Sequence, residues 1–521
     1  MDATSVSISF TEGASSEVRG VSGIKINDTW ILTSGLLYTT TSDKDNDALH
    51  LIRSLKPAIL TCIPVPQKIT NVRVSVTSRA APRAMGTNER SVEDSKISET
   101  CGTICAAWRC PLLSDTLDNL FHGWSFDENS EKTDKALLTI FLLVRLHKDE
   151  QAEFTSTDIL EAEECLTHLL RICQLLETPR RGVDMLIEST PFGNPVFIDS
   201  ISRGIVSNAL GTHDCVMLTD ANAVPGCEGG PVYVITTNGS KLLCGMVIAS
   251  LSWCRGEWVD YTLVARLFPC LMNLLNKHEN IENSVSSHAD VHSSLTEWLD
   301  KSVVLVRCGA EWGSGIILDR PTGTILTCSH VVKEAPERRV RVVFPSSSNG
   351  KSSLSISSVW AKLVYRTARG QAYDVAILIV DTQVMDPTLR SLKIADREAE
   401  NGEPVVSAGY PFFSSTLPTI TRGNISRASA CMLQTTCCVQ SGASGGPIVR
   451  ATTGELLGMV VCNIITSRTL YPRLNMAVPM AAIKQSIGDY IKTQRVEALS
   501  ALTNQEAAVC DAWNFHLPSK I

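Results

Sequence analysis

The chain has 521 residues, of which 44% are hydrophobic and 19% are charged, and its net charge is −7. That length is enough for about two to four domains with separate cores. The negative charge and the absence of a run rich in Lys or Arg argue against nucleic acid or an acidic membrane surface as the main partner. The longest apolar stretch, residues 136–144, is too short to span a bilayer, and the first residues do not form a secretory signal.

Eighteen cysteines are scattered along the chain. Because no export signal is visible, free thiols are a better interpretation than disulfides. No two cysteines have the Cys-x-x-Cys spacing, so a structural zinc site is not predicted. We expect neither a metal nor an organic cofactor.

Residues 1–276 are predicted to form a first domain. Within it, residues 78–102 are rich in Ser, Thr, Arg, Glu and Ala, which indicates a mobile insertion. Residues 156–176 carry apolar side chains at helical spacing and predict an amphipathic helix, and a second helix is expected over 264–275. The polar residues 277–298 are interpreted as a linker.

Residues 299–495 are predicted to form a second domain, and 496–521 a tail. Short strands alternate with turns from Ser302 onward, a pattern typical of an all-β barrel. A hairpin that begins near Gly313 ends on His330, and Asp374 stands at the head of a run apolar enough to be a buried strand. A closing helix is expected after Pro479.

The chemistry of the second domain is predicted to centre on Ser444, within the sequence Ser-Gly-Ala-Ser-Gly-Gly-Pro. Glycines on both sides allow the tight turn that exposes a nucleophilic hydroxyl, and the N–H groups of Gly442 and Ser444 are expected to form an oxyanion hole. His330 is the only histidine between His292 and His516, so it is the only candidate for an imidazole base. The order His330, Asp374, Ser444 is that of a chymotrypsin-like triad, in which the serine is the nucleophile, the histidine the base and the aspartate its orienting acid.

The first domain repeats the second in a degenerate form. Residues 30–37 match the stretch that ends on His330, with Leu36 in place of the histidine. Residues 218–231 match the serine loop, with Glu228 in place of the serine. Leu36 cannot accept a proton, and a glutamate would put an anion beside N–H groups meant to bind one. We therefore expect the first domain to be inactive.

Four strings of the second domain resemble successive motifs of the Deg/HtrA-type trypsin-like serine proteases. They are residues 313–332, 374–380, 434–447 and 475–479. Ala443 departs from the asparagine usual before the nucleophile, which bears on substrate detail more than on catalysis. The resemblance implies an all-β fold of two tandem trypsin-like double β-barrel units, the first degenerate, with helical insertions and a C-terminal helix.

The last three residues indicate which members of this family the chain resembles. Ser519, Lys520 and Ile521 are similar to the Ser-Lys-Leu peroxisomal address, and no stretch of PDZ-domain size follows the closing helix. A duplicated unit with one inactive copy and this terminus is similar to the peroxisomal relatives of plant Deg proteases.

That resemblance implies limited proteolysis in the peroxisomal matrix. The implied reactions are removal of N-terminal leaders from imported enzymes, typically after a cysteine, trimming of some β-oxidation enzymes, and self-cleavage. The implied partners are leader-bearing precursors and the import receptor that reads the C-terminus, and a homo-oligomer is compatible with it.

Two further sites are expected. Cys438 lies six residues before Ser444, where trypsin-like proteases place the base of the specificity pocket, and an uncharged base suits a small residue. Self-cleavage is expected at Cys105–Ala106, because Cys110 is followed by a proline that hinders cleavage.

Two other functions stay open. A general quality-control protease or chaperone would degrade unfolded chains without favouring leaders. A pseudoprotease scaffold would use both domains for binding and would not react with a serine-directed probe.

Overall fold

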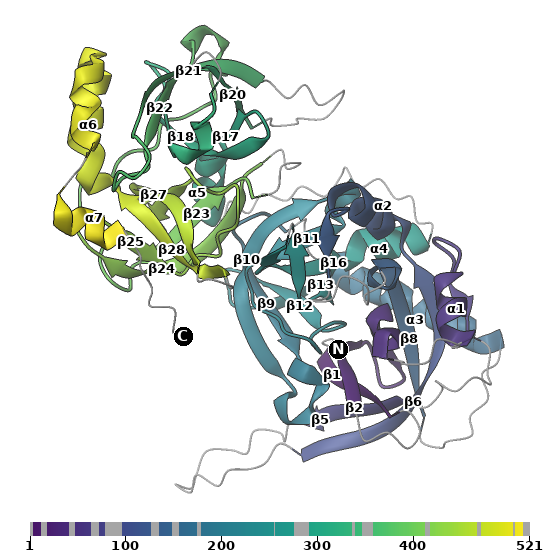
Figure 1. Ribbon diagram of the computed structural model, residues 1–521. Helices are drawn as coiled ribbons and strands as arrows, with labels where there is room; N and C mark the ends of the chain where they lie inside the picture. Colours follow the sequence, from purple (N-terminus) through teal and green to yellow (C-terminus); the bar gives the residue numbers. More distant parts are fainter. Residues whose placement is uncertain are drawn as a thin grey trace, which may run out of the picture. The chain divides into compact units, whose positions relative to one another are not determined.

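A computed structural model describes residues 4–11, 18–40, 47–63, 72–78, 96–126, 135–147, 156–174, 179–254, 256–275, 291–335, 339–345, 358–411, 417–465, 470–503 and 506–513. The chain divides into two compact units, Met1–His288 and Ala289–Ile521 (Figure 1). No described helix is both long and apolar enough to cross a membrane.

The N-terminal unit contains two six-stranded barrels. The first is built from β1 (Thr4–Thr11), β2 (Val18–Lys25), β3 (Trp30–Ser34), β5 (Val72–Ser78), β6 (Lys96–Arg109) and β8 (Ile140–His147). Pairing of β6 with β8 closes this ring, and β4 (Thr61–Cys62) adds to the outside of β6. The second is built from β9 (Asp184–Ser189), β10 (Ser200–Leu210), β11 (Val216–Thr219), β12 (Pro231–Ile235), β13 (Lys241–Ala249) and β16 (Thr262–Arg266).

Helices and one small sheet complete this unit. The described helices are α1 (Asp47–Arg53), α2 (Pro111–Leu120), α3 (Ser156–Gln174) and α4 (Leu267–Leu274). A three-stranded sheet joins β7 (Trp124–Ser125), β14 (Ser252–Cys254) and β15 (Glu257–Val259). Helix α3 confirms the amphipathic pattern over 156–176, and its Leu166 and Leu169 are fully buried.

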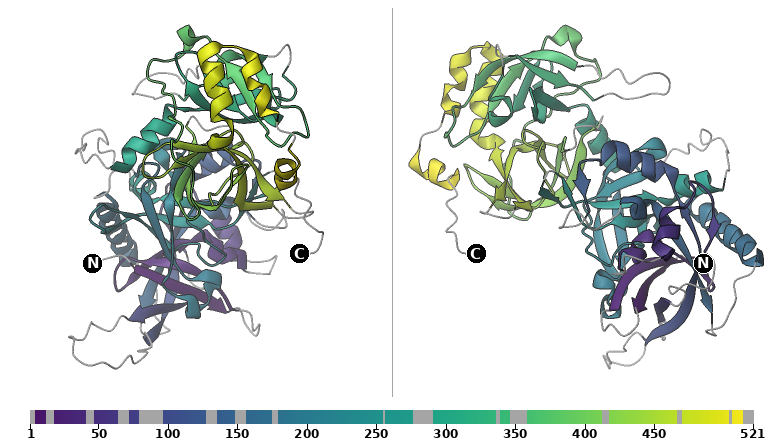
Figure 2. Two further views of the ribbon diagram at one scale, coloured as in Figure 1. Left: turned by 90° about the vertical axis from the view of Figure 1, so that its left-hand side faces the viewer. Right: turned by 45° about the vertical axis from the view of Figure 1, so that its right-hand side comes forward.

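The C-terminal unit also contains two six-stranded barrels. The first is built from β17 (Val303–Cys308), β18 (Glu311–Asp319), β19 (Thr324–Thr327), β20 (Arg339–Val343), β21 (Ser358–Arg366) and β22 (Ala376–Ile379). The second is built from β23 (Pro404–Gly409), β24 (Thr419–Ala428), β25 (Leu433–Thr435), β26 (Pro447–Arg450), β27 (Leu456–Ile465) and β28 (Leu470–Pro479). Helices α5 (Val291–Asp300), α6 (Met480–Thr493) and α7 (Ala507–Trp513) flank them (Figure 2).

All four barrels have the same connectivity. Each ring joins its strands in the order first, second, third, sixth, fifth, fourth, counted along the chain. The alternation of buried and exposed residues that closure requires is clear in β20, where Val340 and Val342 are buried and Arg339 and Arg341 are exposed. The predicted fold of two tandem double β-barrel units is confirmed.

Three segments differ from the sequence expectations. Residues 96–102 of the expected insertion belong to strand β6, which pairs with β5 from Gly102 to Lys96, whereas residues 79–95 lie outside the described part. Helix α5 occupies the end of the expected linker because Leu295 and Leu299 recur at helical spacing, and Leu299 is fully buried. Helix α4 begins at Leu267, later than expected, because Val264 belongs to strand β16.

Candidate active site

Antiparallel pairing of β19 with β22 brings His330 and Asp374 together. In this ladder Thr327 is opposite Ala376. The residues just beyond the end of β19 therefore meet those just before the start of β22. His330 opens the short 3-10 turn His330–Val332, and Asp374 lies two residues before the start of β22.

The carboxylate of Asp374 contacts His330 at two points, its ring and its backbone N–H. His330 Nδ1 lies 2.5 Å from Asp374 Oδ2, and the backbone N–H of His330 donates to Asp374 Oδ1 at 3.0 Å. An ionised carboxylate can only accept, so Nδ1 carries the proton and Nε2 is left with a free lone pair. The imidazole is 46% exposed and the carboxylate 26%, so the Nε2 edge is accessible to a substrate.

Ser444 follows a tight turn whose geometry requires glycine. The N–H of Ala443 donates to the carbonyl of Gln440 at 3.0 Å, and Gly442, in the third position of this turn, has φ of +98°. A positive φ at that position defines a type II turn, which side chains other than glycine or asparagine strain. A Cβ at Gly442 would also lie 2.4 Å from Trp312 Nε1.

A buried serine holds this turn in place. Ser314 Oγ donates to the carbonyl of Gly442 at 2.9 Å and accepts the N–H of Tyr410 at 2.9 Å. The N–H of Ser314 donates to the carbonyl of Ser444 at 2.7 Å. We call this arrangement the serine clamp. It fixes both ends of the Gly442–Ser444 segment to strand β18 of the first barrel.

Residues next to His330 and the residue Ser444 itself contact the same two strands, β18 and β27. An ideal Cβ at Gly313 would lie 2.5 Å from Val331 Cγ2 and 2.9 Å from the carbonyl oxygen of Ser444. Along strand β27, Cys328 Sγ donates to the carbonyl of Val460 at 3.2 Å, and Ser444 Oγ donates to the carbonyl of the next residue, Val461, at 3.0 Å. The segments that carry the imidazole and the hydroxyl therefore lie side by side between the two barrels.

Two backbone donors beside Ser444 are open. Among the described residues, neither the N–H of Gly442 nor that of Ser444 has a hydrogen-bond acceptor, whereas Ala443, Gly445 and Gly446 all donate within the fold. Paired N–H groups without an acceptor, next to a hydroxyl, form a site for a negatively charged oxygen.

One group of possible metal ligands occurs in the described part of the chain. Cys328 Sγ, His330 Nδ1 and a carboxylate oxygen of Asp374 lie within 4.8 Å of one another. Burial, together with the nearby Asp374, holds the pKa of the Cys328 thiol well above its usual range, and its S–H is engaged with Val460. Hydrogen bonds of these side chains to one another and to the backbone explain why the three groups lie close together.

The N-terminal unit contains the same backbone frame. Ser22 Oγ donates to the carbonyl of Gly226 at 2.8 Å and accepts the N–H of Thr190 at 2.8 Å, and the N–H of Ser22 donates to the carbonyl of Glu228 at 2.8 Å. Gly226 has φ of +94°. Ser22, Gly226 and Glu228 therefore repeat the positions of Ser314, Gly442 and Ser444 bond for bond.

Glu228 fills the donor site of this unit. Its Oε2 accepts the N–H of Gly226 at 2.7 Å, and its Oε1 accepts the hydroxyl of Ser250. Leu36 stands in the 3-10 turn Gly35–Thr40 after β3, where the C-terminal unit has His330 after β19. The N-terminal unit thus holds a carboxylate where the C-terminal unit holds the Ser444 hydroxyl and open donors.

Other predicted residues lie elsewhere. Cys438 is buried six residues before Ser444, and its place at the base of a specificity pocket stays a prediction. Cys105 and Ala106 are buried within β6, and Cys110 is buried at the start of α2, so none of them lies in an accessible segment. Cleavage there would require β6 to leave its sheet. The tripeptide 519–521 lies outside the described residues.

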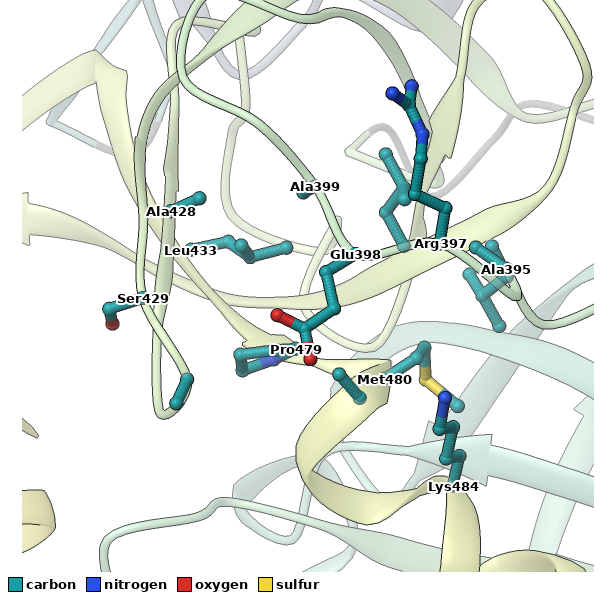
Figure 3. Close-up of a pocket in the computed structure, with 14 residues that line it drawn as sticks. Ala395, Arg397, Glu398, Ala399, Ala428, Ser429, Leu433, Pro479, Met480 and Lys484 are labelled. Atoms are coloured by element: carbon teal, nitrogen blue, oxygen red, sulfur yellow. The ribbon is translucent and has the colours of Figure 1, made fainter.

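A separate pocket lies in the C-terminal unit, at the start of helix α6 (Figure 3). Glu398, Pro479, Met480 and Lys484 are among its lining residues, and the Glu398 carboxylate points toward Pro479. Its lining includes none of His330, Asp374 and Ser444. We therefore assign it no part in the chemistry of Ser444.

Sequence reasoning missed the serine clamp and Asn463, whose amide contacts the carbonyl of Val439 beside the site. A signal for the clamp was present, because a serine precedes a glycine in the matching strand of both units, at Ser22 and at Ser314. Asn463 has no such partner, since the matching strand of the other unit has Ser250 at that point.

Comparisons with known proteins agree with this geometry. Residues 313–459 match the family model of the trypsin-like peptidase domain. The matched residues all lie in the C-terminal unit, in agreement with the resemblance predicted from its motifs.

The chain is also similar to individual proteins. It is 29% identical over 383 residues to the "Peroxisomal leader peptide-processing protease" of Homo sapiens, covering 69% of this chain and 64% of the relative. It is 30% identical over 364 residues to the protein of the same name in Mus musculus, covering 65% and 61%. The chain thus spans less than two thirds of the length of either relative. A crystal structure of the serine endoprotease from Yersinia pestis aligns with 25% identity and a TM-score of 0.32, covering 40% of this chain and 70% of that one.

Proposed function

We propose that the C-terminal unit is a serine endopeptidase that uses Ser444, His330 and Asp374 as its triad. The observation that carries this proposal is the two-point contact of His330 with Asp374, together with the open N–H groups of Gly442 and Ser444. A base, its orienting acid and an anion site beside one hydroxyl form the set that acyl transfer needs.

The mechanism follows from the roles of these groups. Ser444 Oγ attacks the scissile carbonyl, His330 Nε2 takes its proton and returns it to the leaving amine, and Asp374 keeps the proton on Nδ1. The Ser444 hydroxyl first turns about its Cα–Cβ bond, away from the carbonyl of Val461 that it contacts at rest. Catalytic hydrogen bonds commonly tighten only when substrate is bound.

The open donors stabilise the tetrahedral intermediate. The N–H groups of Gly442 and Ser444 bind its oxyanion, and removal of one such donor typically lowers kcat by about a hundred- to a thousandfold. The acyl-enzyme is then hydrolysed by water that His330 activates. Every step uses groups of this chain.

For the biological role, we propose processing of proteins in the peroxisomal matrix. The names of the human and mouse relatives support leader-peptide processing in that organelle. The proposed substrates are leader-bearing precursors and some β-oxidation enzymes, and the import receptor would bind residues 519–521. Self-cleavage belongs to the same proposal, and the burial of Cys105 and Ala106 restricts it to molecules in which β6 has opened.

Two measurements test the proposal together. A fluorophosphonate probe should label the wild-type chain at Ser444, and labelling should disappear in Ser444→Ala and in His330→Ala. A purified leader-bearing precursor should be cut once near its N-terminus, as mass spectrometry of the new terminus would reveal.

The results separate the alternatives. Lack of labelling in a folded wild-type chain would indicate a pseudoprotease. Labelling combined with degradation of casein to small peptides, and no preference for leaders, would indicate a quality-control protease.

A further inference from the structure

The residues of the proposed triad come from both barrels of the C-terminal unit. His330 and Asp374 adjoin strands β19 and β22 of the first barrel, whereas Ser444 lies three residues before β26 of the second. Proton transfer from Ser444 to His330 therefore depends on how firmly the two barrels are held together. The serine clamp holds them on the Ser444 side.

Helix α7, which ends at Trp513, holds the two barrels together on the Asp374 side (Figure 1). The Trp513 ring packs edge-on against the Tyr373 ring, with the ring centroids 6.3 Å apart and the planes at 88°. The indole N–H of Trp513 donates to the carbonyl of Cys431 at 3.0 Å. Tyr373 immediately precedes Asp374, and Cys431 lies in the turn between β24 and β25. One side chain therefore contacts residues of both barrels.

The contact of Trp513 with the second barrel extends toward Ser444. Trp513 packs against a cluster of three buried side chains, Met432, Ile464 and Met476. Ile464 lies on β27, three residues after Val461, whose carbonyl accepts the Ser444 hydroxyl at 3.0 Å. Trp513 thus contacts the neighbour of the triad acid and also the strand that contacts the nucleophile.

The residues before α7 are attached to the first barrel. The 3-10 helix Val496–Leu502 buries Leu499 and Leu502, and the Thr503 hydroxyl lies 2.8 Å from the hydroxyl of Tyr365 on β21. The chain after α6 is therefore fixed to the first barrel before Trp513 reaches the second.

The partner of Trp513 in the first barrel is a buried, neutral ring. Tyr373 is 5% exposed, and burial raises the pKa of its phenol to about 12, so the ring carries no charge at neutral pH. Edge-on aromatic pairs of this kind add to the stabilisation that burial alone provides. Loss of the indole would therefore remove a restraint on the segment that carries Asp374.

We propose that Trp513 is a positioning residue for the reaction of Ser444. It acts through Tyr373 on Asp374 and through Ile464 on the strand beside Ser444, and so keeps the His330 base at the distance that proton transfer requires. A misplacement of about 1 Å caused by a change far from the chemistry can lower a rate by about a hundredfold. This inference rests on the proposed function of the C-terminal unit.

The test measures the rate constant of fluorophosphonate labelling at Ser444 and the kinetics of peptide cleavage. Trp513→Ala should lower the labelling rate constant and kcat by about ten- to a hundredfold. KM should change by less than about twofold, because the alignment of base and nucleophile is disturbed and not the binding of substrate. Trp513→Phe keeps an aromatic ring against Tyr373 and should stay near the wild-type rate. Trp360→Ala is the matched control, because Trp360 belongs to the same unit and is 58% exposed, and it should leave both measurements unchanged.

A double variant tests the route through Tyr373. Tyr373→Leu should slow labelling about as much as Trp513→Ala, and the combination should be no slower than the slower single variant, because both changes break the same contact. Losses that multiply in the double variant would overturn this route. If Trp513→Ala fails to fold, Trp513→Leu replaces it, since leucine keeps an apolar side chain but has neither the ring nor the donor, and the same loss is expected.

The outcomes separate this inference from the proposed function. A wild-type chain that labels at Ser444, together with a Trp513→Ala variant that labels at the same rate constant, would overturn the role of Trp513 and leave the peptidase intact. A lower extent of labelling or a lower unfolding midpoint in Trp513→Ala, with an unchanged rate constant in the molecules that do label, would show a purely structural role and would also overturn it. Neither labelling nor cleavage in the wild-type chain would overturn the proposed function and this inference with it.

Discussion

The carboxylate of Glu228 accepts the N–H of Gly226 at 2.7 Å, whereas the matching N–H of Gly442 has no acceptor among the described residues. The same backbone turn thus occurs twice in one chain, once with its glycine N–H bound to a carboxylate of the chain itself and once with that N–H open. The difference lies in one side chain, since the clamp bonds of Ser22 and Ser314 agree within 0.1 Å. The occupied site accounts physically for the inactivity expected of the N-terminal unit.

Glu228→Ser should not make the N-terminal unit reactive. Combined with Ser444→Ala, it supplies a hydroxyl beside the freed N–H of Gly226, but Leu36 offers no lone pair to accept the proton. We expect no labelling by a fluorophosphonate above the level of Ser444→Ala alone. Labelling at position 228 would show that another group serves as the base.

Asp374→Asn should reduce acylation by about 10⁴-fold, because an amide in place of the carboxylate favours the wrong imidazole tautomer. The rate of probe labelling at Ser444 measures this loss, and the circular dichroism spectrum should be unchanged. Asp396→Asn is a suitable control, since that carboxylate is 87% exposed and contacts Lys393. A loss of less than tenfold in Asp374→Asn would contradict the orienting role.

Gly442→Ala should lower the labelling rate by about a hundred- to a thousandfold. The added Cβ would meet Trp312 Nε1 at 2.4 Å and the carbonyl of Tyr410 at 2.5 Å, so the turn must move and take its N–H out of place. Gly402→Ala is the matched control, because Gly402 also has a positive φ, +82°, but open space around its missing side chain. Equal losses in the two variants would mean that backbone strain alone, and not the oxyanion site, is responsible.

The ion pair of Glu403 with Arg450 should make the C-terminal unit sensitive to acid. Arg450 Nε lies 2.5 Å from Glu403 Oε1, and both side chains are at most 10% exposed. Burial raises the pKa of Glu403, but the bonds from Arg450 and from the N–H of Glu400 outweigh it, so the pKa is lowered overall. The stabilisation is therefore present above the unfolded pKa of about 4.3 and is lost as the pH falls through the lower folded value.

Glu403→Gln tests this contribution. Removal of one partner from a buried pair typically costs about 3–5 kcal/mol. We expect a loss of that order at pH 7 in urea unfolding, shrinking as the pH falls below 4. Glu400→Gln should cost less than about 1 kcal/mol, because Glu400 is 66% exposed in its pair with Arg397. A loss for Glu403→Gln that does not change with pH would point to packing instead.

Local sequence predicted the strands around the site and the order of its residues, because each lies at the end of an apolar run. His330 follows β19 and Asp374 precedes β22, and antiparallel pairing then brings them together. Strand β6 was harder to predict. Its first residues, 96–102, are polar, and it is a strand because β5 and β8 pair with it, which is a long-range effect that composition does not contain.

Asn463 could not be identified from sequence for a similar reason. An asparagine within a strand is ordinary, and its bond to the carbonyl of Val439 depends on the folding of residues that lie 24 positions apart in the chain. The burial of Cys105 is also a tertiary effect. The sequence places it near a polar stretch, but the closing of the first barrel covers it.

The hydrogen bonds of the serine clamp are also present in the N-terminal unit, which has Leu36 and Glu228 where the C-terminal unit has His330 and Ser444. Ser22 and Ser314 each tie the two barrels of their unit together through one buried hydroxyl, and neither of these hydroxyls bonds to the side chains that differ between the units. The hydrogen bonds that hold the two barrels together are therefore independent of the side chains proposed to carry out the reaction. The same frame holds the Ser444 hydroxyl beside open donors in one unit and the Glu228 carboxylate on a donor in the other, so the state of the donor site depends on the side chain at that one position.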